Sequence, residues 1–247
     1  MKNILFLLIL LSIALFSKEV NVVFSYSTPP YVFKDGSGIV VSIVKEALAY
    51  KEHVLKPVFV NIGRSFELFR DGYVDASSII QISSGLEAFY SDDFMEYYNA
   101  AFVLKNKHIK IEQLEDLKDL YTIAFQNAHV YLGEEFGKIS QLADKKYIEI
   151  ADQKQQVYML FKERTEVIIM DRNIFTFYKN LLIQEKKIDG NIKAELIELF
   201  SPTPYKMAFK DKTLRDDFNK GVAHLKKSGR FDAIYFEYSQ KYFEIKK

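Results

Sequence analysis

The sequence predicts an α/β fold of two lobes built on one plan. Short runs rich in Val, Ile and aromatic residues alternate with runs whose apolar residues recur at helical spacing. This alternation occurs twice, before and after the polar stretch 105–110, and no low-complexity tract or flexible linker separates the two series. The 247 residues, 49% of them hydrophobic, can fill a sizeable core.

The first series opens with an alternating, valine-rich strand over 19–26. Gly36 and Gly38 mark a turn, after which Val40, Ile43 and Val44 begin the apolar face of a helix over 39–51. The pattern then predicts strands over 54–60, 74–82 and 99–104 and a short helix over 65–70.

The second series repeats this order after residue 110. Strands over 121–125, 147–150 and 166–170 are each followed by an amphipathic run, which predicts helices over 129–136, 152–162 and 173–183. Two β-like runs over 194–199 and 206–209 lie on either side of Pro202 and Pro204. Helices over 212–227 and 231–243, separated by Ser228-Gly229, close the chain.

The first 17 residues form a separate segment. Lys2 gives it a positive start, and the run Ile4–Phe16 is nearly unbroken in apolar character but shorter than the ~20 residues that span a membrane. These features predict a secretory signal peptide over 1–17, cut near Ser17, and therefore a periplasmic protein. An uncleaved N-terminal anchor is the alternative.

Composition excludes several classes of function. The 34 Lys and Arg residues balance 33 Asp and Glu residues, so nothing favours nucleic acid as a partner. The absence of Cys excludes disulfides, thiolate metal sites, thiol nucleophiles and a lipidated N-terminal Cys. The four histidines lack metal-ligand spacing, so we expect no metal and no cofactor. The 21 Phe and 16 Tyr residues suit a protein that packs or grips with aromatic surfaces.

A search for catalytic motifs finds little. The chain has no G-x-S-x-G string, phosphate-binding loop or dinucleotide fingerprint. The Asp92-Asp93 pair is more typical of a solvated loop than of paired acids, because nothing in the sequence places a base opposite it. His129, near a predicted helix start, is either structural or a ligand contact.

Six segments, taken in order, resemble the type II periplasmic solute-binding proteins of the polar amino-acid group (extracellular solute-binding family 3). They are STPPYVFKDGSGIVVSIVKEAL (27–48), ELFRDGYVDAS (67–77), YSDDF (90–94), IEQLEDLKDLYTIAFQNA (111–128), LFKERTEVIIMD (160–171) and YKMAFKDKTLRDDFNKGVAHLKKSGRFDAIYFEY (205–238). Each motif alone is weak, but together they cover almost the whole chain after the signal segment.

The resemblance implies a type II two-lobed fold with two hinge-crossing strands, near 98–103 and 205–209. Lobe 1 would then comprise 18–103 and 209–247, and lobe 2 would comprise 104–208. It also implies a monomer that closes on a small-molecule solute and an inner-membrane ABC permease as its partner.

Members of this family that bind α-amino acids hold the ligand carboxylate with an arginine after the third strand. That position falls on Glu87 counting forward from Val74-Asp75, or on Ser84 counting back from Tyr90-Ser91. No arginine occurs between Arg70 and Arg164, so the usual carboxylate clamp is missing. Arg64 is either a substitute cation or an exposed helix-start residue.

The remaining site residues follow from the resemblance. Asp171 matches the residue that receives the ligand's amino group, although it also suits an ordinary helix N-cap. The stacking aromatic aligns with Thr28, which leaves Tyr26 or Tyr31 to supply the wall unless Tyr31 packs into lobe 1. The expected polar contacts are Ser83 and Ser84 from lobe 1 and the helix-start loop Asn127, Ala128 and His129 from lobe 2.

These observations predict an exported, non-catalytic protein that captures a small polar solute for an ABC-type transporter. The missing arginine argues against a standard L-amino acid, whereas Asp171 favours a ligand with an amine or several hydroxyls. One alternative is a periplasmic enzyme on the same fold, similar to cyclohexadienyl dehydratase, with Glu87, His129 and Asp171 as its only acid–base candidates. Another is a ligand-sensing partner of a membrane receptor.

Overall fold

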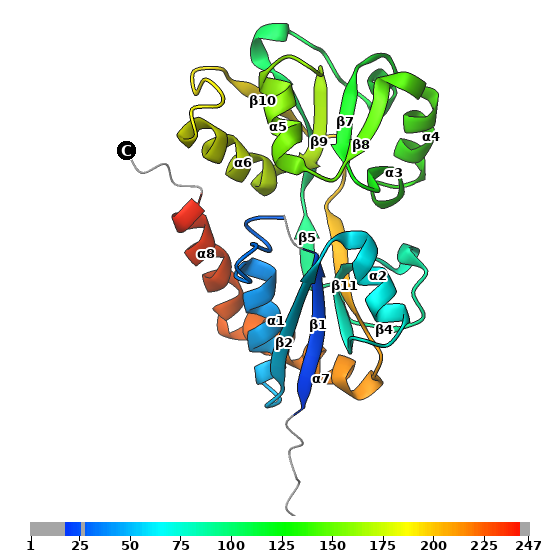
Figure 1. Cartoon of the computed structure of the whole chain (residues 1–247), viewed down its shortest axis with the longest axis vertical. Coiled ribbons are helices and arrows are strands. Elements are labelled where there is room, and N and C mark those ends of the chain that lie inside the picture. Colours follow the sequence, from blue (N-terminus) through cyan, green and yellow to red (C-terminus); the bar gives the residue numbers. More distant parts are fainter. Residues whose placement is uncertain (1–17, 26–27, 243–247) are drawn as a thin grey trace, which may run out of the picture.

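The structure, a computed structural model, describes residues 18–25 and 28–242. The predicted signal segment 1–17 and the candidate wall residue Tyr26 therefore lie outside the described residues. Within the described part, two sheets with their own helices form two lobes stacked along the long axis of the molecule (Figure 1). No helix in the described ranges is both long and apolar enough to cross a membrane.

The sheet of the first lobe mixes parallel and antiparallel strands in the order β2-β1-β3-β11-β4, and β5 pairs with β11 off this path. Its strands are β1 (Glu19–Ser25), β2 (Val54–Val60), β3 (Ala76–Ile80), β4 (Phe89–Tyr90), β5 (Met95–Tyr97) and β11 (Thr203–Phe209). β1 runs parallel to β2 and β3, whereas β11 runs antiparallel to β3, β4 and β5. A late strand thus sits inside the sheet that the chain begins.

Four helices of the described residues belong to this lobe: α1 (Ile39–Ala49), α2 (Ile62–Arg70), α7 (Lys212–Ser228) and α8 (Arg230–Tyr242). α1 and α7 pack so closely that a Cβ added at Gly221 would lie 2.0 Å from the carbonyl oxygen of Ala47. Gly38, at φ 140°, begins α1 where a Cβ would collide with the Tyr31 carbonyl oxygen at 2.2 Å. Glycine at these two positions allows the helix and the preceding loop to approach their neighbours.

The sheet of the second lobe has the order β10-β6-β9-β7-β8. Its strands are β6 (Asn99–Leu104), β7 (Thr122–Phe125), β8 (Tyr147–Ile150), β9 (Val167–Asp171) and β10 (Ala194–Ile197). β7 is parallel to β8 and β9, and β6 is antiparallel to β9 and β10. Each face of β9 packs in a hydrophobic cluster, so the strand is buried throughout, as the unbroken apolar run in the sequence predicts.

The helices of the second lobe are α3 (Ala128–Tyr131), α4 (Glu134–Leu142), α5 (Gln153–Phe161) and α6 (Arg172–Gln184). Short 3₁₀ turns occur at Ile82–Ser84 in the first lobe and at Lys105–Lys107, Leu114–Asp119 and Asp144–Lys146 in the second. The single helix predicted over 129–136 is wrong. Gly133, at φ 95°, takes a conformation that interrupts a helix, and the segment forms α3 and α4 instead.

Two segments connect the lobes, from β5 to β6 and from β10 to β11. Among the strands that the structure describes, β6 pairs only within the second sheet, and β11 only within the first. The sheets therefore divide between Tyr97 and Asn99 and between Ile197 and Thr203, earlier in each case than the predicted boundaries at 103/104 and 208/209. β11 also starts earlier than predicted, because Pro204 is accommodated where β11 pairs with β5 alone.

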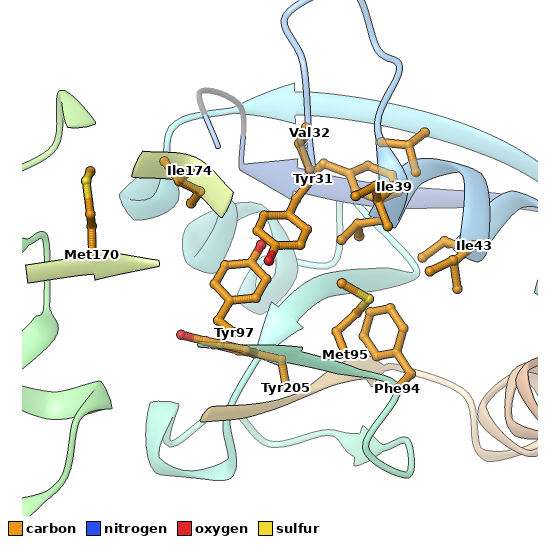
Figure 2. Close-up of a cluster of buried hydrophobic side chains, with 14 of the residues drawn as sticks. Tyr31, Val32, Ile39, Ile43, Phe94, Met95, Tyr97, Met170, Ile174 and Tyr205 are labelled. Carbon is orange, nitrogen blue, oxygen red and sulfur yellow. The ribbon is translucent and has the colours of Figure 1, made fainter. Parts of the chain in front are cut away.

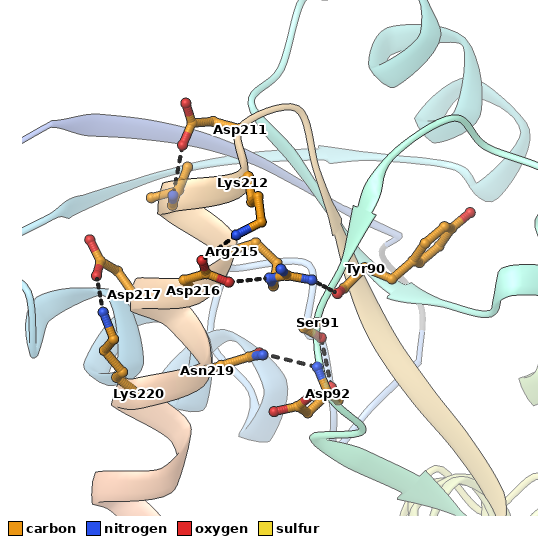
Figure 3. A network of polar contacts seen from close by, with 11 residues as sticks. Tyr90, Ser91, Asp92, Asp211, Lys212, Arg215, Asp216, Asp217, Asn219 and Lys220 are labelled. Carbon is orange, nitrogen blue, oxygen red and sulfur yellow. Dashed lines mark hydrogen bonds and ion pairs between the residues drawn. The ribbon is translucent and has the colours of Figure 1, made fainter.

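A polar network fastens α7 to the edge of the first sheet (Figure 3). Arg215 donates to the Tyr90 carbonyl oxygen at 2.8 Å and pairs with Asp216, and the Asp92 backbone N–H donates to Asn219 at 3.1 Å. Asp93 forms an ion pair with Lys206 at 2.7 Å. The Asp92-Asp93 pair thus contributes to packing at the end of the sheet.

Candidate functional site

A cavity of about 610 Å³ lies between the lobes and takes its lining from both. The first lobe contributes the ends of β1 and β3, the loop before α1, and β5, while the second contributes the C-terminal ends of β7 and β9 and the starts of α5 and α6. Aromatic side chains are prominent in the lining: Phe33, Tyr97, Phe125, Tyr131, Phe177, Tyr178 and Tyr205. The volume is in the range of small-molecule sites.

Asp171 lies at the end of β9, is 1% exposed and lines this cavity. Its carboxylate caps α6 by accepting the backbone N–H groups of Asn173 at 2.8 Å and Ile174 at 3.1 Å. It also accepts the Tyr98 backbone N–H at 2.8 Å and the Tyr31 hydroxyl at 3.2 Å. Burial raises the pKa of Asp171 to about 6, against the opposing effect of these hydrogen bonds.

Tyr31 reaches Asp171 from the other lobe. Its ring is fully buried and lies against the ring of Tyr97 (Figure 2), with the two centroids 4.2 Å apart. Its hydroxyl also accepts a hydrogen bond from the Asn173 side chain at 2.9 Å. The resemblance places a ligand amine at Asp171. The structure places the Tyr31 hydroxyl there, so Tyr31 links the lobes instead of forming an open wall of the cavity.

A carboxylate also accepts the backbone N–H groups at the start of α3. Glu149 of β8 accepts the backbone N–H groups of Asn127 at 2.7 Å and His129 at 2.9 Å, the His129 ring at 2.8 Å and the Tyr147 hydroxyl at 2.6 Å. Burial acts to raise the pKa of Glu149, but these hydrogen bonds together hold it below its ordinary value. The N–H groups that the resemblance offers to a ligand carboxylate are therefore bound by the chain's own carboxylate.

The predicted site residues are not all brought together. Thr28 and Asp171 line the inter-lobe cavity, and Ser83 lines a second, more open hollow of about 660 Å³ beside the hinge. The others line neither: Tyr31, Ser84, Glu87, Asn127, Ala128 and His129.

Glu87 and Arg64, the two charged first-lobe candidates, both lie outside the cavity. The Glu87 side chain is exposed, and Arg64 forms an exposed ion pair with Glu67 at 2.6 Å. Neither position supplies the missing carboxylate clamp in this arrangement.

The sequence reasoning missed the aromatic residues at the hinge. Tyr97 and Tyr205 lie side by side on the adjacent strands β5 and β11 (Figure 2). Their ring centroids are 4.9 Å apart, and the ring of Tyr131 in α3 meets Tyr205 at 6.2 Å. Tyr205 is the first residue of the predicted crossing strand at 205–209, so the sequence does indicate that it lies near the cavity. Tyr97 had none, because its position depends on the pairing of β5 with β11.

Tyr97 carries a buried hydroxyl that makes no hydrogen bond of standard geometry among the residues that the structure describes, and Thr28 is the one polar side chain close enough to lower its pKa. Tyr97 is 7% exposed, and burial raises the pKa of its hydroxyl well above the ordinary value, although the Thr28 side chain is near enough to oppose that rise. The Gln153 side-chain oxygen, at the first turn of α5, is likewise buried without a partner there. Both residues line the cavity, one from each lobe.

Few charges are available inside the cavity. Lys154 is paired with Glu185 at 2.7 Å, Asp152 caps α5 through the Gln155 N–H, and Lys34 is exposed. Across residues 18–25 and 28–242, no group of three or more His, Asp or Glu side chains is placed to hold a metal ion.

Comparison with protein-family models and with curated proteins gives no match. Solved structures match over most of their length. An ancestral arginine-binding protein bound to arginine has a TM-score of 0.70 and 20% identity, covering 92% of this chain and 98% of that one. A histidine kinase sensor domain with similarity to periplasmic binding proteins has a TM-score of 0.70 and 16% identity, covering 89% and 95%.

An amino acid ABC transporter substrate-binding protein from Streptococcus pneumoniae, bound to L-arginine, has a TM-score of 0.68 and 14% identity, covering 93% of this chain and 97% of that one. Likeness at this level of identity shows the fold. The predicted two-lobed periplasmic-binding-protein fold is therefore confirmed, and the neighbours are consistent with a divergent member of the group that the sequence motifs resemble.

Proposed function

We propose that this chain is a non-catalytic solute-binding protein that holds a small molecule between its lobes. The observation that carries the proposal is the inter-lobe cavity, which is lined from both sides by residues at the ends of strands and the starts of helices. A solute that contacts both walls gains contacts only in the closed form, and so it shifts the population toward closure.

Delivery to an inner-membrane ABC permease is the finer part of the proposal. It is supported by the motif resemblance and by the transporter-associated protein among the structural neighbours. Export through a signal peptide over 1–17, periplasmic location and action as a monomer belong to the same proposal. A sensor domain among the structural neighbours supports the alternative, a ligand-sensing partner of a membrane receptor.

Thermal unfolding with a panel of amino acids, amines, polyols and neutral ring compounds tests solute binding. The proposal expects saturable stabilisation by at least one class, because a ligand that binds only the folded state raises its stability by mass action. A panel without any saturable shift, repeated by isothermal titration, would contradict it. Pull-down of a membrane permease or of a receptor by the liganded protein would separate transport from sensing.

The enzymatic alternative would require acid–base groups to meet at one place. Among its three candidates, only Asp171 lines the inter-lobe cavity, whereas Glu87 is exposed and His129 is paired with Glu149. This separation favours binding over catalysis. Turnover of prephenate or arogenate by the purified protein, lost in Asp171→Asn, would favour the enzyme instead.

A further inference from the structure

We propose that the inter-lobe cavity selects an uncharged, ring-shaped solute with hydrogen-bonding groups, and not a zwitterionic amino acid. This inference rests on the proposed solute-binding function and assigns a ligand class to it. It departs from the amine-bearing ligand that the sequence motifs favour. Three features of the described residues support it: occupied charge sites, aromatic walls and two buried polar atoms without partners.

The first feature is that the protein itself fills both positions at which the family resemblance places the charges of a ligand. The Asp171 carboxylate already accepts three backbone N–H groups and the Tyr31 hydroxyl. Glu149 binds the N–H groups at the start of α3. An ammonium group at Asp171 would have to displace Tyr31, and a carboxylate at the start of α3 would have to displace Glu149. Each charge would therefore be desolvated without a ready partner, which costs free energy.

The second feature is the character of the walls. The Tyr97, Tyr131 and Tyr205 rings form one aromatic group at the hinge side, with centroid separations of 4.9 Å and 6.2 Å. Phe33 and Phe177 meet edge to face at 5.5 Å between the lobes. Such surfaces favour a flat, weakly polar ring, which stacks on aromatic faces without desolvating a charge.

The third feature supplies polarity to the site. The Tyr97 hydroxyl offers a donor from the first lobe, and the Gln153 side-chain oxygen offers an acceptor from the second. A buried polar atom without a partner is costly, and a ligand that satisfies it recovers that cost. The matching solute therefore carries an acceptor for Tyr97 and a donor for Gln153.

Isothermal titration with matched probes tests the ligand class. The probes are 4-ethylphenol, tyramine and L-tyrosine, with adenine as a second neutral ring and the standard L-amino acids as a reference. At least one neutral ring is expected to bind at least about tenfold more tightly than any zwitterion in the panel.

Two variants connect the ring to the proposed contacts. Tyr97→Phe and Gln153→Met are each expected to weaken binding of that ring about tenfold, because each removes one hydrogen bond to a buried ligand. Tyr73→Phe and Gln141→Met, at exposed positions outside the cavity, are matched controls and should leave the affinity unchanged. Tyr97→Phe should change the melting temperature of the ligand-free protein little, since the lost hydroxyl makes no hydrogen bond of standard geometry there.

Tighter binding of amino acids, or unchanged ring affinity in both variants, would overturn the ligand class while leaving solute binding in place. Failure of every neutral ring to bind also overturns it. If the amino acids, amines and polyols fail as well, the proposed function falls with it.

Discussion

Two carboxylates in the second lobe, Glu149 and Asp171, accept backbone N–H groups at the starts of helices. Their pKa values are shifted in opposite directions. Asp171 is almost fully enclosed, so burial outweighs four hydrogen bonds and raises its pKa. Glu149 lies nearer the surface, where its hydrogen bonds outweigh burial and lower its pKa. The same side-chain chemistry thus makes opposite contributions to the pH dependence of stability.

Asp171 gives a pH prediction at the scale of one residue. The pKa of Asp171 is about 6 in the folded protein, and the ordinary value of 3.8 applies to the unfolded chain. The folded form therefore binds more protons than the unfolded form between these two pH values. Its contribution to the free energy of unfolding is therefore fully present below pH 4 and is lost as the pH rises through 6. Relative to the non-titrating variant Asp171→Asn, the wild type should lose about 2 kcal/mol of stability between pH 4.5 and 7. Urea unfolding at both pH values measures this difference, and parallel pH profiles would contradict it.

At the scale of the element, local patterns predict most strands and helices of this chain. The buried run at β9 and the amphipathic run at α6 are predicted within a few residues of their ends, because periodicity reports which face is covered. Apolar spacing alone predicts one helix over 129–136 and gives no sign of the α3–α4 break, which occurs at Gly133. Glu149 could not be predicted as the partner of α3, since that contact depends on β8 lying beside β7.

The candidate site is predictable to a smaller extent. Asp171 stands at the end of an evident strand, and its predicted capping of α6 is confirmed, whereas its contact with a ligand amine stays a prediction. The engagement of Asp171 by Tyr31 joins residues 140 positions apart and has no local signature. The contact between the hinge aromatics likewise has no local signature in the sequence, because only the pairing of β5 with β11 brings Tyr97 beside Tyr205.

The α3 start gives a prediction at this scale. Glu149→Ala leaves two backbone N–H groups of the helix start without their acceptor, so the free energy of unfolding at pH 7 should fall by about 2 kcal/mol. The same variant should gain measurable affinity for sulfate, because the exposed N–H groups can then bind an anion. Chemical denaturation with and without sulfate checks both effects. The matched control is Glu195→Ala, an exposed position on β10 of the same lobe.

The α1–α7 contact provides a second prediction for an element pair. Gly221→Ala places a Cβ 2.0 Å from the Ala47 carbonyl oxygen, so the two helices must separate. We expect a loss of about 3 kcal/mol in the free energy of unfolding, as overpacked interfaces show. Lys227→Ala, on an exposed part of α7, is the control and should change stability little. Equal stability of the two variants would show that the helices tolerate the shift.

At the scale of the whole molecule, side chains of the protein itself join the lobes. Tyr31 binds Asp171 across the cleft, and Phe33 of the first lobe contacts Phe177 of α6. Tyr242 at the end of α8 also contacts Phe177, with centroids 5.7 Å apart. These contacts stabilise closure before any solute binds, so a ligand needs to supply less of the closing free energy.

Weakening these contacts should open the molecule. Tyr31→Phe removes the hydrogen bond to Asp171, and Phe177→Ala removes the aromatic contact with Phe33, so each should raise the population of separated lobes. Small-angle X-ray scattering of the ligand-free protein should then show a larger radius of gyration, with a further increase in the double variant. Tyr121→Phe, exposed on the second lobe, serves as the control. An unchanged radius in both single variants would assign closure to other contacts.

The position of β11 between β3 and β4 has a consequence for the order of folding. All five strands of the second sheet come from the continuous stretch 99–197, whereas the first sheet lacks an internal strand until residues 203–209 have emerged. A chain that appears from its N-terminus can therefore complete the lobe encoded in its middle before the lobe it began. Until then, the edge of β3 stays unpaired and open to association with other chains. The late arrival of one strand thus allows the second lobe to fold before the lobe at the N-terminus.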